Sequence, residues 1–302
     1  MDPTPNLPAS ALFSLAGQNV LITGASRGTC ASIPLLHSTS QYPSAQPLTD
    51  NTSVLSSPTY VLSPLGIGAA CAIALAEAGA DLCLVERPST AAKNTATRDA
   101  IAVLGRTVRV VECDLADLED VKTVFARALD AMGGEIHVLV NCAGIQRRSP
   151  AVQFPEADWD DVINVNLKSV WLLSQAAGQH MVPRRRGKII NFCSLLTFQG
   201  GLTVPAYAAA KGALGQLTKA LSNEWSKDNV QVNGICPGYI ATDMNERLLQ
   251  DPTRLRQITE RIPAGRWGEP KDFAGPVVFL ASKASQYVCG ELLVVDGGWM
   301  GR

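Results

Sequence analysis

A tyrosine and a lysine stand four residues apart in an alanine-rich run, Tyr207 and Lys211 in PAYAAAK. This composition predicts a helix, on which residues four apart share a face. A lysine ammonium beside a tyrosine favours the phenolate, so the tyrosine can act as a general base, and the ammonium can also hold a hydroxyl of a bound cofactor. Alone, the pair is equally compatible with an ordinary aromatic–cation contact on a helix surface.

A serine precedes this pair at a position where α/β proteins place their chemistry. Ser194 follows the apolar stretch 188–193, which we expect to be a strand. Open parallel sheets bind ligands at the carboxyl ends of their strands. Three turns follow other expected strands in the same way: TGASRG at 23–28, NCAG at 141–144 and PG at 237–238. We therefore expect these segments to meet at one edge of a sheet.

The ordered set of segments resembles the signature of the short-chain dehydrogenase/reductase family, from about Leu15 to the C-terminus. The resemblance implies a single-domain, Rossmann-like α/β fold, a doubly wound parallel sheet with helices on both faces. It also implies a nicotinamide cofactor and the catalytic residues Ser194, Tyr207 and Lys211. Asn166 matches a family position at which asparagine distorts a helix and holds a water in a proton path. A mid-helix asparagine otherwise points to solvent.

Composition and charge exclude several classes of function. The 302 residues are 46% apolar with a net charge of −1, which leaves no electrostatic footprint for nucleic acid or an anionic membrane. No run is apolar enough to span a bilayer, and the first 26 residues contain no Lys or Arg, so we expect a cytoplasmic protein without a leader. The eight cysteines lack metal-ligand spacing, which predicts reduced thiols and no metal site. We expect one domain over residues 15–302, behind a loose segment at 1–14.

The expected phosphate-binding turn is interrupted. After a strand over 19–22, TGASRG should lead directly into a helix, but residues 29–66 intervene, rich in Ser, Thr and Pro. Joining Gly28 to Ile67 restores TGASRGIGAACAIALAEAGA, a continuous turn and helix. The segment is either a disordered surface insertion or an unspliced intron retained in the deduced sequence. We favour the second, because long structureless loops are uncommon in compact domains; if translated, the segment lies across the pyrophosphate site.

The resemblance places the cofactor along the carboxyl ends of successive strands. Glu86, after a strand at 81–85, can accept hydrogen bonds from the adenosine ribose diol and repel a 2′-phosphate, so NAD is the expected cofactor. Arg27 and Arg87 favour NADP instead, because arginine suits phosphate. Asp114 is placed beside the adenine, or simply caps the following helix. The expected cofactor-binding residues are Gly24, Ser26, Arg27, Gly28, Gly66, Ile67, Gly68, Glu86, Arg87, Asp114, Leu115, Asn141, Ala143, Gly144, Tyr207, Lys211, Pro237, Gly238, Ile240 and Thr242.

Several stretches resemble the 2-deoxy-D-gluconate 3-dehydrogenases and related diketo-deoxygluconate reductases: GIQRRSPA, SLLTFQGGLTVPAYAAAKGA, RIPAGRWGEP and VVDGGWMGR. Arg147 and Arg148 can bind a sugar-acid carboxylate, or form a plain surface pair. Gln199 is expected to meet sugar hydroxyls, and residues 243–268 correspond to a substrate lid. The resemblance also implies a homotetramer or homodimer, formed through the apolar face of the helix that starts at Tyr207.

Two alternatives share most of these residues. An NADPH-dependent ketoacyl or ketone reductase would use the same catalytic set, with Glu86 against it and Arg27 and Arg87 in its favour. A catalytically silent nucleotide-binding protein would arise only if the interrupted turn is real. The expected function is therefore an oxidoreductase acting on a sugar acid such as 2-deoxy-D-gluconate.

Overall fold

The computed structural model describes residues 1–25, 65–91 and 95–302. They contain a seven-stranded sheet made of β1 (Asn19–Thr23), β2 (Asp81–Glu86), β3 (Val108–Glu112), β4 (Val138–Asn141), β5 (Gly187–Phe192), β6 (Val230–Pro237) and β7 (Leu292–Val295). All neighbouring pairs are parallel, in the order β3-β2-β1-β4-β5-β6-β7. The order reverses direction between β1 and β4, which is the switch point of a doubly wound sheet. The expected fold class is confirmed.

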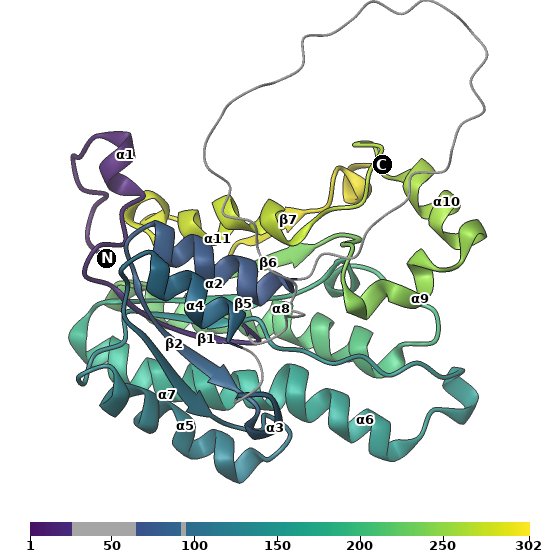
Figure 1. Cartoon of the computed structure of the whole chain (residues 1–302), viewed down its shortest axis with the longest axis horizontal. Coiled ribbons are helices and arrows are strands. Elements are labelled where there is room, and N and C mark those ends of the chain that lie inside the picture. The colour runs from purple at the N-terminus through teal and green to yellow at the C-terminus, as the bar shows by residue number, and fades with distance from the viewer. Residues whose placement is uncertain (26–64, 92–94) are drawn as a thin grey trace, which may run out of the picture.

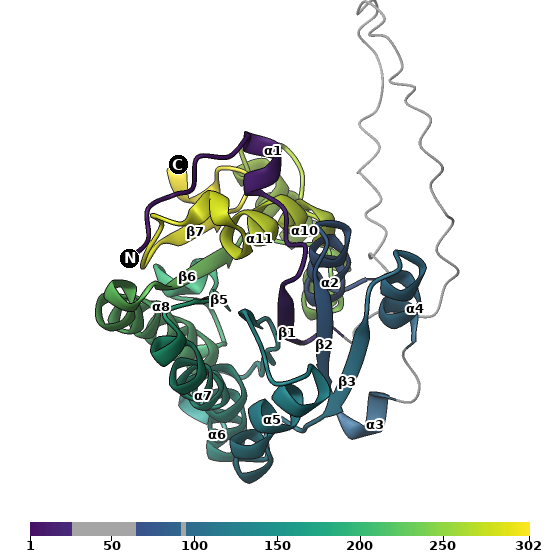
Figure 2. The same cartoon turned by 90° about the vertical axis from the view of Figure 1, so that its left-hand side faces the viewer.

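Helices cover both faces of this sheet. They are α1 (Ala9–Leu12), α2 (Ile67–Glu77), α3 (Pro88–Ala91), α4 (Ala96–Val103), α5 (Leu118–Ala131), α6 (Glu156–Ile163), α7 (Ser169–Arg184), α8 (Pro205–Trp225), α9 (Glu246–Leu249), α10 (Pro252–Arg261) and α11 (Ala274–Ala281). One face packs against α2, α4 and α11, and the other against α5, α7 and α8 (Figure 1, Figure 2). The strands are nearly all apolar because they are buried on both faces. No helix in the described ranges has the length and apolarity to cross a membrane.

The two ends of the interrupted turn meet in space. A Cβ atom on Gly68, in the first turn of α2, would lie 2.4 Å from the carbonyl oxygen of Gly24. Gly24 itself has a φ of +78°, a conformation that favours glycine. The backbones of the turn and of α2 therefore approach each other as closely as only glycine allows. The intervening residues, which include Ser26, Arg27, Gly28 and the expected insertion up to residue 64, lie outside the described part of the chain.

The start of α5 differs from one expectation. Asp117 caps this helix, because its Oδ1 accepts hydrogen bonds from the backbone N–H groups of Glu119 and Asp120 at 3.0 and 3.3 Å. The interpretation of Asp114 as the helix cap is therefore wrong. Its Oδ1 instead accepts a hydrogen bond from Ala116 N at 3.1 Å, which closes a local turn.

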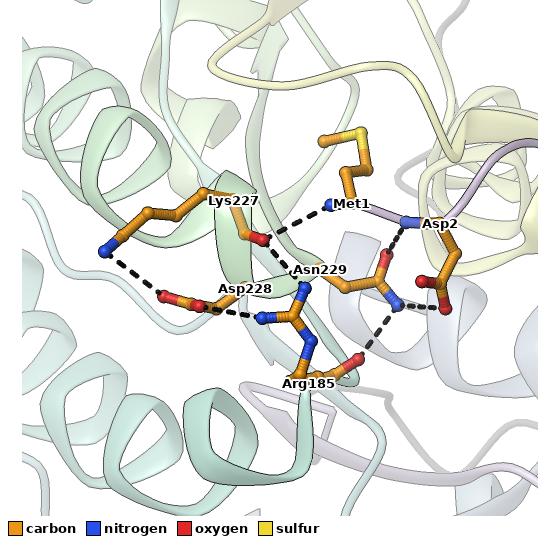
Figure 3. Close-up of polar contacts among 6 residues, drawn as sticks. All are labelled: Met1, Asp2, Arg185, Lys227, Asp228 and Asn229. Carbon is orange, nitrogen blue, oxygen red and sulfur yellow. Dashed lines mark hydrogen bonds and ion pairs between the residues drawn. The ribbon is translucent and has the colours of Figure 1, made fainter.

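The amino ends of β5 and β6 carry a hydrogen-bond network (Figure 3). Asn229 Nδ2 donates to the Arg185 carbonyl at 2.9 Å and to Asp2 Oδ2 at 3.1 Å. Arg185 Nη2 donates to the Lys227 carbonyl at 3.1 Å. The Met1 ammonium donates to the same carbonyl at 3.2 Å. The first two residues, which fall in the segment expected to be loose, are thus bonded to the loops that precede these strands.

Candidate active site

A cavity of about 680 Å³ opens at the carboxyl edge of the sheet. Its lining comes from the glycine turn, from the loops that follow β4, β5 and β6, and from α8 and α10, so segments distant in sequence converge where such folds bind ligands. The expected site residues that line it are Gly24, Gly66, Ile67, Gly68, Arg87, Leu115, Ala143, Gly144, Arg148, Ser194, Gln199, Tyr207, Lys211, Pro237, Gly238, Ile240 and Thr242.

Tyr207 and Lys211 lie on the buried face of α8. Lys211 Nζ is 5.6 Å from the centroid of the Tyr207 ring. It donates a hydrogen bond of 2.6 Å to the Phe192 carbonyl at the end of β5. This bond uses one of the three ammonium hydrogens and leaves two for a ligand. The ammonium therefore sits over the phenol ring at the wall of the cavity, as the four-residue spacing predicted.

Thr197 connects Ser194 to the same helix. The Thr197 hydroxyl accepts a hydrogen bond from Ser194 N at 3.2 Å and donates one to the Lys211 carbonyl at 2.9 Å. Ser194 Oγ accepts from Leu196 N at 3.2 Å, so its own hydrogen is available to a ligand. Gly215 makes room for this link, since a Cβ there would lie 2.4 Å from Thr197 Cγ2. No sequence motif marks Thr197, because a threonine shortly after a strand is common in proteins.

Asn166 lies in a π-helical turn, Asn164–Lys168, between α6 and α7. Its Oδ1 accepts from Ile145 N at 3.0 Å, and its Nδ2 donates to the carbonyls of Ile145 and Val162 at 2.9 and 2.8 Å. The helix is distorted here, as the resemblance implied. Both amide hydrogens are bonded within the protein, so a water held at Asn166 has to use an acceptor atom of this residue.

Hydrogen bonds also fix the loop after β4. Thr23 Oγ1 accepts from the backbone N–H groups of Cys142 and Ala143, each at 3.1 Å. Asn141 Nδ2 donates to Asn191 Oδ1 at 2.9 Å and so links β4 to β5. Thr23, another residue that the sequence analysis did not select, thus joins the glycine turn to the loop that follows β4.

Glu86 ends β2 and is 1% exposed. Neither of its carboxylate oxygens has a hydrogen-bond partner within the described ranges. Burial raises the pKa of this carboxyl, against the opposing effect of Arg98. Glu86 itself does not line the cavity, although its neighbours Val85 and Arg87 do. A buried carboxylate without donors is destabilising, so hydroxyl groups of a ligand would stabilise it if the side chain turned toward the cavity. The ribose diol of a dinucleotide has this chemistry.

Arg87 follows Glu86 and lines the cavity. Its Nε lies 3.6 Å from Asp114 Oδ1, in a pair in which both side chains are more than one-third exposed. Such a pair contributes little to stability. It nevertheless occupies one edge of the guanidinium, so Arg87 is only partly free to bind a phosphate.

The two consecutive arginines after the NCAG turn have different surroundings. Arg147 forms ion pairs with Asp158 at 3.4 Å and Asp161 at 3.3 Å and does not line the cavity, contrary to the expectation of a substrate role. Arg148 lines the cavity, and burial lowers its pKa. Its guanidinium forms no ion pair with any described residue. Of these two arginines, only Arg148 is therefore placed to meet an anion bound in the cavity.

Two arginines that the sequence analysis did not select complete the charge of the cavity. Arg254 and Arg261, both on α10, line it together with Arg148. Asp243 is an acidic residue in the same lining. The substrate end is thus predominantly cationic, which favours an anionic ligand. No family motif marks these arginines, because their position depends on how α10 packs over the site.

Within the described ranges, no cluster of three or more His, Cys, Asp or Glu side chains could bind a metal ion. The cysteines within those ranges are free thiols. The side chains that line the cavity instead offer hydrogen bonds and positive charge.

The chain is similar to known proteins over most of its length. The model of a family described as enoyl-(acyl carrier protein) reductase matches residues 61–300. A 2-dehydro-3-deoxy-D-gluconate 5-dehydrogenase of Pseudoalteromonas atlantica is 51% identical over 237 residues, or 78% of this chain and 92% of the relative. A gluconate 5-dehydrogenase of Gluconobacter oxydans is 36% identical over 287 residues, or 95% of this chain and 96% of the relative.

A solved structure shows the same similarity. The gluconate 5-dehydrogenase from Burkholderia cenocepacia, in complex with NADP and tartrate, has a TM-score of 0.80 and 34% identity to this chain. The match covers 98% of this chain and 100% of that one. Fold, site geometry and sequence similarity lead to one assignment: the chain belongs to the short-chain dehydrogenase/reductase family of oxidoreductases.

Proposed function

We propose that this oxidoreductase transfers hydride between a nicotinamide dinucleotide and a secondary hydroxyl or ketone of a gluconate-type sugar acid. The observation that carries the proposal is one cavity in which Ser194, Tyr207 and Lys211 lie together with Arg148, a cation that no described residue pairs. The two curated relatives are named as 5-dehydrogenases of such acids. We therefore place the reacting carbon at position 5, rather than at position 3 of the subgroup expected from the sequence.

The catalytic roles follow from the hydrogen-bonding capacity of each side chain. Tyr207, as the phenolate, removes the proton of the substrate hydroxyl. Lys211 has two free ammonium hydrogens, which bind the cofactor ribose and keep the phenolate paired. Ser194 has a free hydroxyl hydrogen, which it donates to the substrate oxygen. The nicotinamide, when bound, accepts or supplies the hydride. Asn166 orders the helix beside this site and holds the water that receives the proton.

Arg148 binds the substrate carboxylate. A half-buried guanidinium with no carboxylate partner in the described part of the chain gains most from an anion that forms two parallel hydrogen bonds. Gln199, which lines the same cavity, bonds to hydroxyls of the sugar chain. We expect Arg148→Met to raise the KM for a sugar acid about 30-fold. The KM of the same variant for a neutral ketone should rise much less.

We propose NAD as the preferred cofactor. The support is the carboxylate of Glu86, which has no hydrogen-bond partner among the described residues and would accept from the two ribose hydroxyls and repel a 2′-phosphate. Arg87 is partly occupied by Asp114. The Burkholderia cenocepacia structure holds NADP, so the preference of this chain has to be measured directly.

The test is a matrix of substrates and cofactors. D-gluconate, 5-keto-D-gluconate and acetoacetyl-coenzyme A are assayed with NAD(H) and with NADP(H). We expect turnover of the sugar acids, with a higher kcat/KM for NADH than for NADPH. Preferential reduction of the acyl substrate with NADPH contradicts the proposal and identifies a ketoacyl reductase. NADH binding without turnover of any substrate identifies a silent nucleotide-binding protein.

We also propose a cytosolic homotetramer or homodimer. The free thiols within the described residues suit a reducing compartment. The outer face of α8 presents Ala209 and Ala213 to the surface, where a second α8 can approach closely. Light scattering coupled to size-exclusion chromatography measures the assembly, and a monomer at micromolar concentration contradicts it.

A further inference from the structure

Two tryptophans in one aromatic cluster differ in their hydrogen bonding. Trp267 Nε1 donates to Thr259 Oγ1 at 3.1 Å. Trp299 Nε1 is buried and has no partner within the described ranges. Both rings pack against Tyr239, with centroid distances of 5.4 and 4.7 Å. A buried N–H without an acceptor is destabilising, so packing alone does not account for the indole at position 299.

The unpaired indole is the one at the active-site cavity. Trp299 lines this cavity together with Tyr207, whereas Trp267 does not line it. The C-terminal segment that carries Trp299 lies beside α10 (Figure 1). Arg302 Nη1 fixes it there with a hydrogen bond of 3.2 Å to the Glu260 carbonyl. A fixed segment thus places in the cavity wall an indole whose buried N–H has no acceptor among the described residues.

A second donor lies against the same ring. The Arg261 guanidinium carbon is 3.8 Å from the centroid of Trp299. Stacking on an aromatic face orients the plane of a guanidinium and leaves the N–H groups at its edge free. Indole and guanidinium are donors only. Their juxtaposition therefore fits an oxygen atom that can accept from both.

We propose that Trp299 Nε1 and Arg261 bind one hydroxyl oxygen of the substrate chain and thereby select polyhydroxy acids over simple ketones. The inference rests on the proposed function, in which Arg148 binds the carboxylate and Tyr207 meets the reacting carbon. A substrate without that hydroxyl leaves the buried N–H unpaired, and a site built around such a donor discriminates strongly against it.

The test compares Trp299→Phe with its matched control, Trp267→Phe. We expect Trp299→Phe to raise the KM for 5-keto-D-gluconate about tenfold, with kcat within about twofold. Its kcat/KM for cyclohexanone, which has no hydroxyl, is expected to stay within about twofold, and its Tm should fall less than that of Trp267→Phe, which loses a hydrogen bond as well as ring volume. Trp267→Phe loses an internal hydrogen bond, so its Tm should fall while its KM for the sugar acid is unchanged.

The outcomes separate this inference from the proposed function. An unchanged KM for 5-keto-D-gluconate in Trp299→Phe overturns the inference while sugar-acid activity stands. If that variant does not fold, Arg261→Met, at an exposed position, tests the same inference. A raised KM for 5-keto-D-gluconate supports the binding of the hydroxyl by both residues, and an unchanged KM overturns it. A wild-type enzyme that turns over no sugar acid overturns the proposed function and this inference together.

Discussion

At the amino end of the sheet, buried polar side chains bind one another, whereas at the carboxyl end several have no partner within the described residues. Asn229 is 8% exposed and bonds to Asp2 and Arg185 (Figure 3). Lys188, also 8% exposed, donates to Ser285 Oγ at 3.2 Å. These contacts complete the scaffold without a ligand.

The carboxyl end differs, because several buried polar atoms lack a partner there although Asn166 and Lys211 are bonded within the protein. Both oxygens of Glu86, the Oδ1 atom of Asn141 and the Nε1 atom of Trp299 are buried without hydrogen-bond partners in the part of the chain that the structure describes. Glu86 and Asn141 are the last residues of their strands, and Trp299 follows β7. Buried polar atoms are almost always paired in folded proteins. Trp299 lines the cavity, and Glu86 and Asn141 each adjoin residues that line it, so these atoms lie at the end of the sheet where the cavity opens.

The largest effect is expected for Tyr207→Phe, which removes the proton acceptor at the carboxyl end. We expect kcat to fall by at least about 10³-fold, because the phenol beside the Lys211 ammonium is removed. The Kd for NADH, measured by fluorescence titration, should change less than about twofold. Tyr287→Phe, at a residue that is 88% exposed, is the control and should keep full activity. An active Tyr207→Phe enzyme removes the phenol from the mechanism.

Lys188→Met tests the amino end of the sheet, where the buried polar side chains have partners. Burial lowers the pKa of Lys188 from 10.5 to about 8. The fold therefore disfavours its charged form, a penalty of about 3 kcal/mol that is fully present below pH 8 and is relieved as pH rises from 8 to 10.5. We expect Lys188→Met to raise Tm at pH 7 and to lose this rise of stability with pH. Thermal melts at pH 7 to 10 measure both. A variant with a lower Tm at pH 7 shows that the Ser285 contact outweighs burial.

Asn229→Ala breaks the network at the amino end. The variant loses bonds to Asp2 and Arg185 and places alanine at a φ of +61°. We expect about 2 kcal/mol less stability in urea unfolding. The kcat/KM well below the melting temperature should be unchanged, because the network is remote from the cavity. Lys227→Ala is the matched control, since Lys227 accepts both hydrogen bonds through its carbonyl and its exposed side chain adds only an ion pair of 3.9 Å to Asp228. A lowered kcat/KM would show that the network at the amino end of the sheet affects catalysis at the carboxyl end.

Glu86→Gln has the smallest expected effect. Burial raises the pKa of Glu86, so its ionised form is disfavoured in the fold and stability falls as pH rises from 4.5 through the raised value. We expect the cofactor-free variant to be about 1 kcal/mol more stable at pH 7. Its ratio of kcat/KM for NADH to that for NADPH should fall about tenfold. Lower stability of Glu86→Gln would show that the carboxylate is satisfied without cofactor.

Local pattern predicted the elements and the catalytic face. The apolar runs gave the strands because parallel strands are buried on both sides, and the spacing of Tyr207 and Lys211 needed only helical geometry. Local pattern could not predict which of Arg147 and Arg148 lines the cavity. Both have the same side chain, and the carboxylates of α6 hold one of them away from the cavity.

The remaining site residues depend on tertiary packing. Arg254, Arg261 and Trp299 meet at the cavity only because α10 and the C-terminal segment pack over it. Thr23 and Thr197 are ordinary residues until their hydroxyls bridge two loops. The expected role of Asp114 as a cap failed because an aspartate three residues later occupies the N-cap position.

Direct transfer of hydride to a sugar acid can be followed with a label. The wild-type enzyme is given 5-keto-D-gluconate and NADH deuterated at both C4 positions, and the product is analysed by mass spectrometry and NMR. The account predicts a sugar acid with a single deuterium on the carbon that was the ketone. A product without deuterium, or no reaction with this substrate, would contradict it.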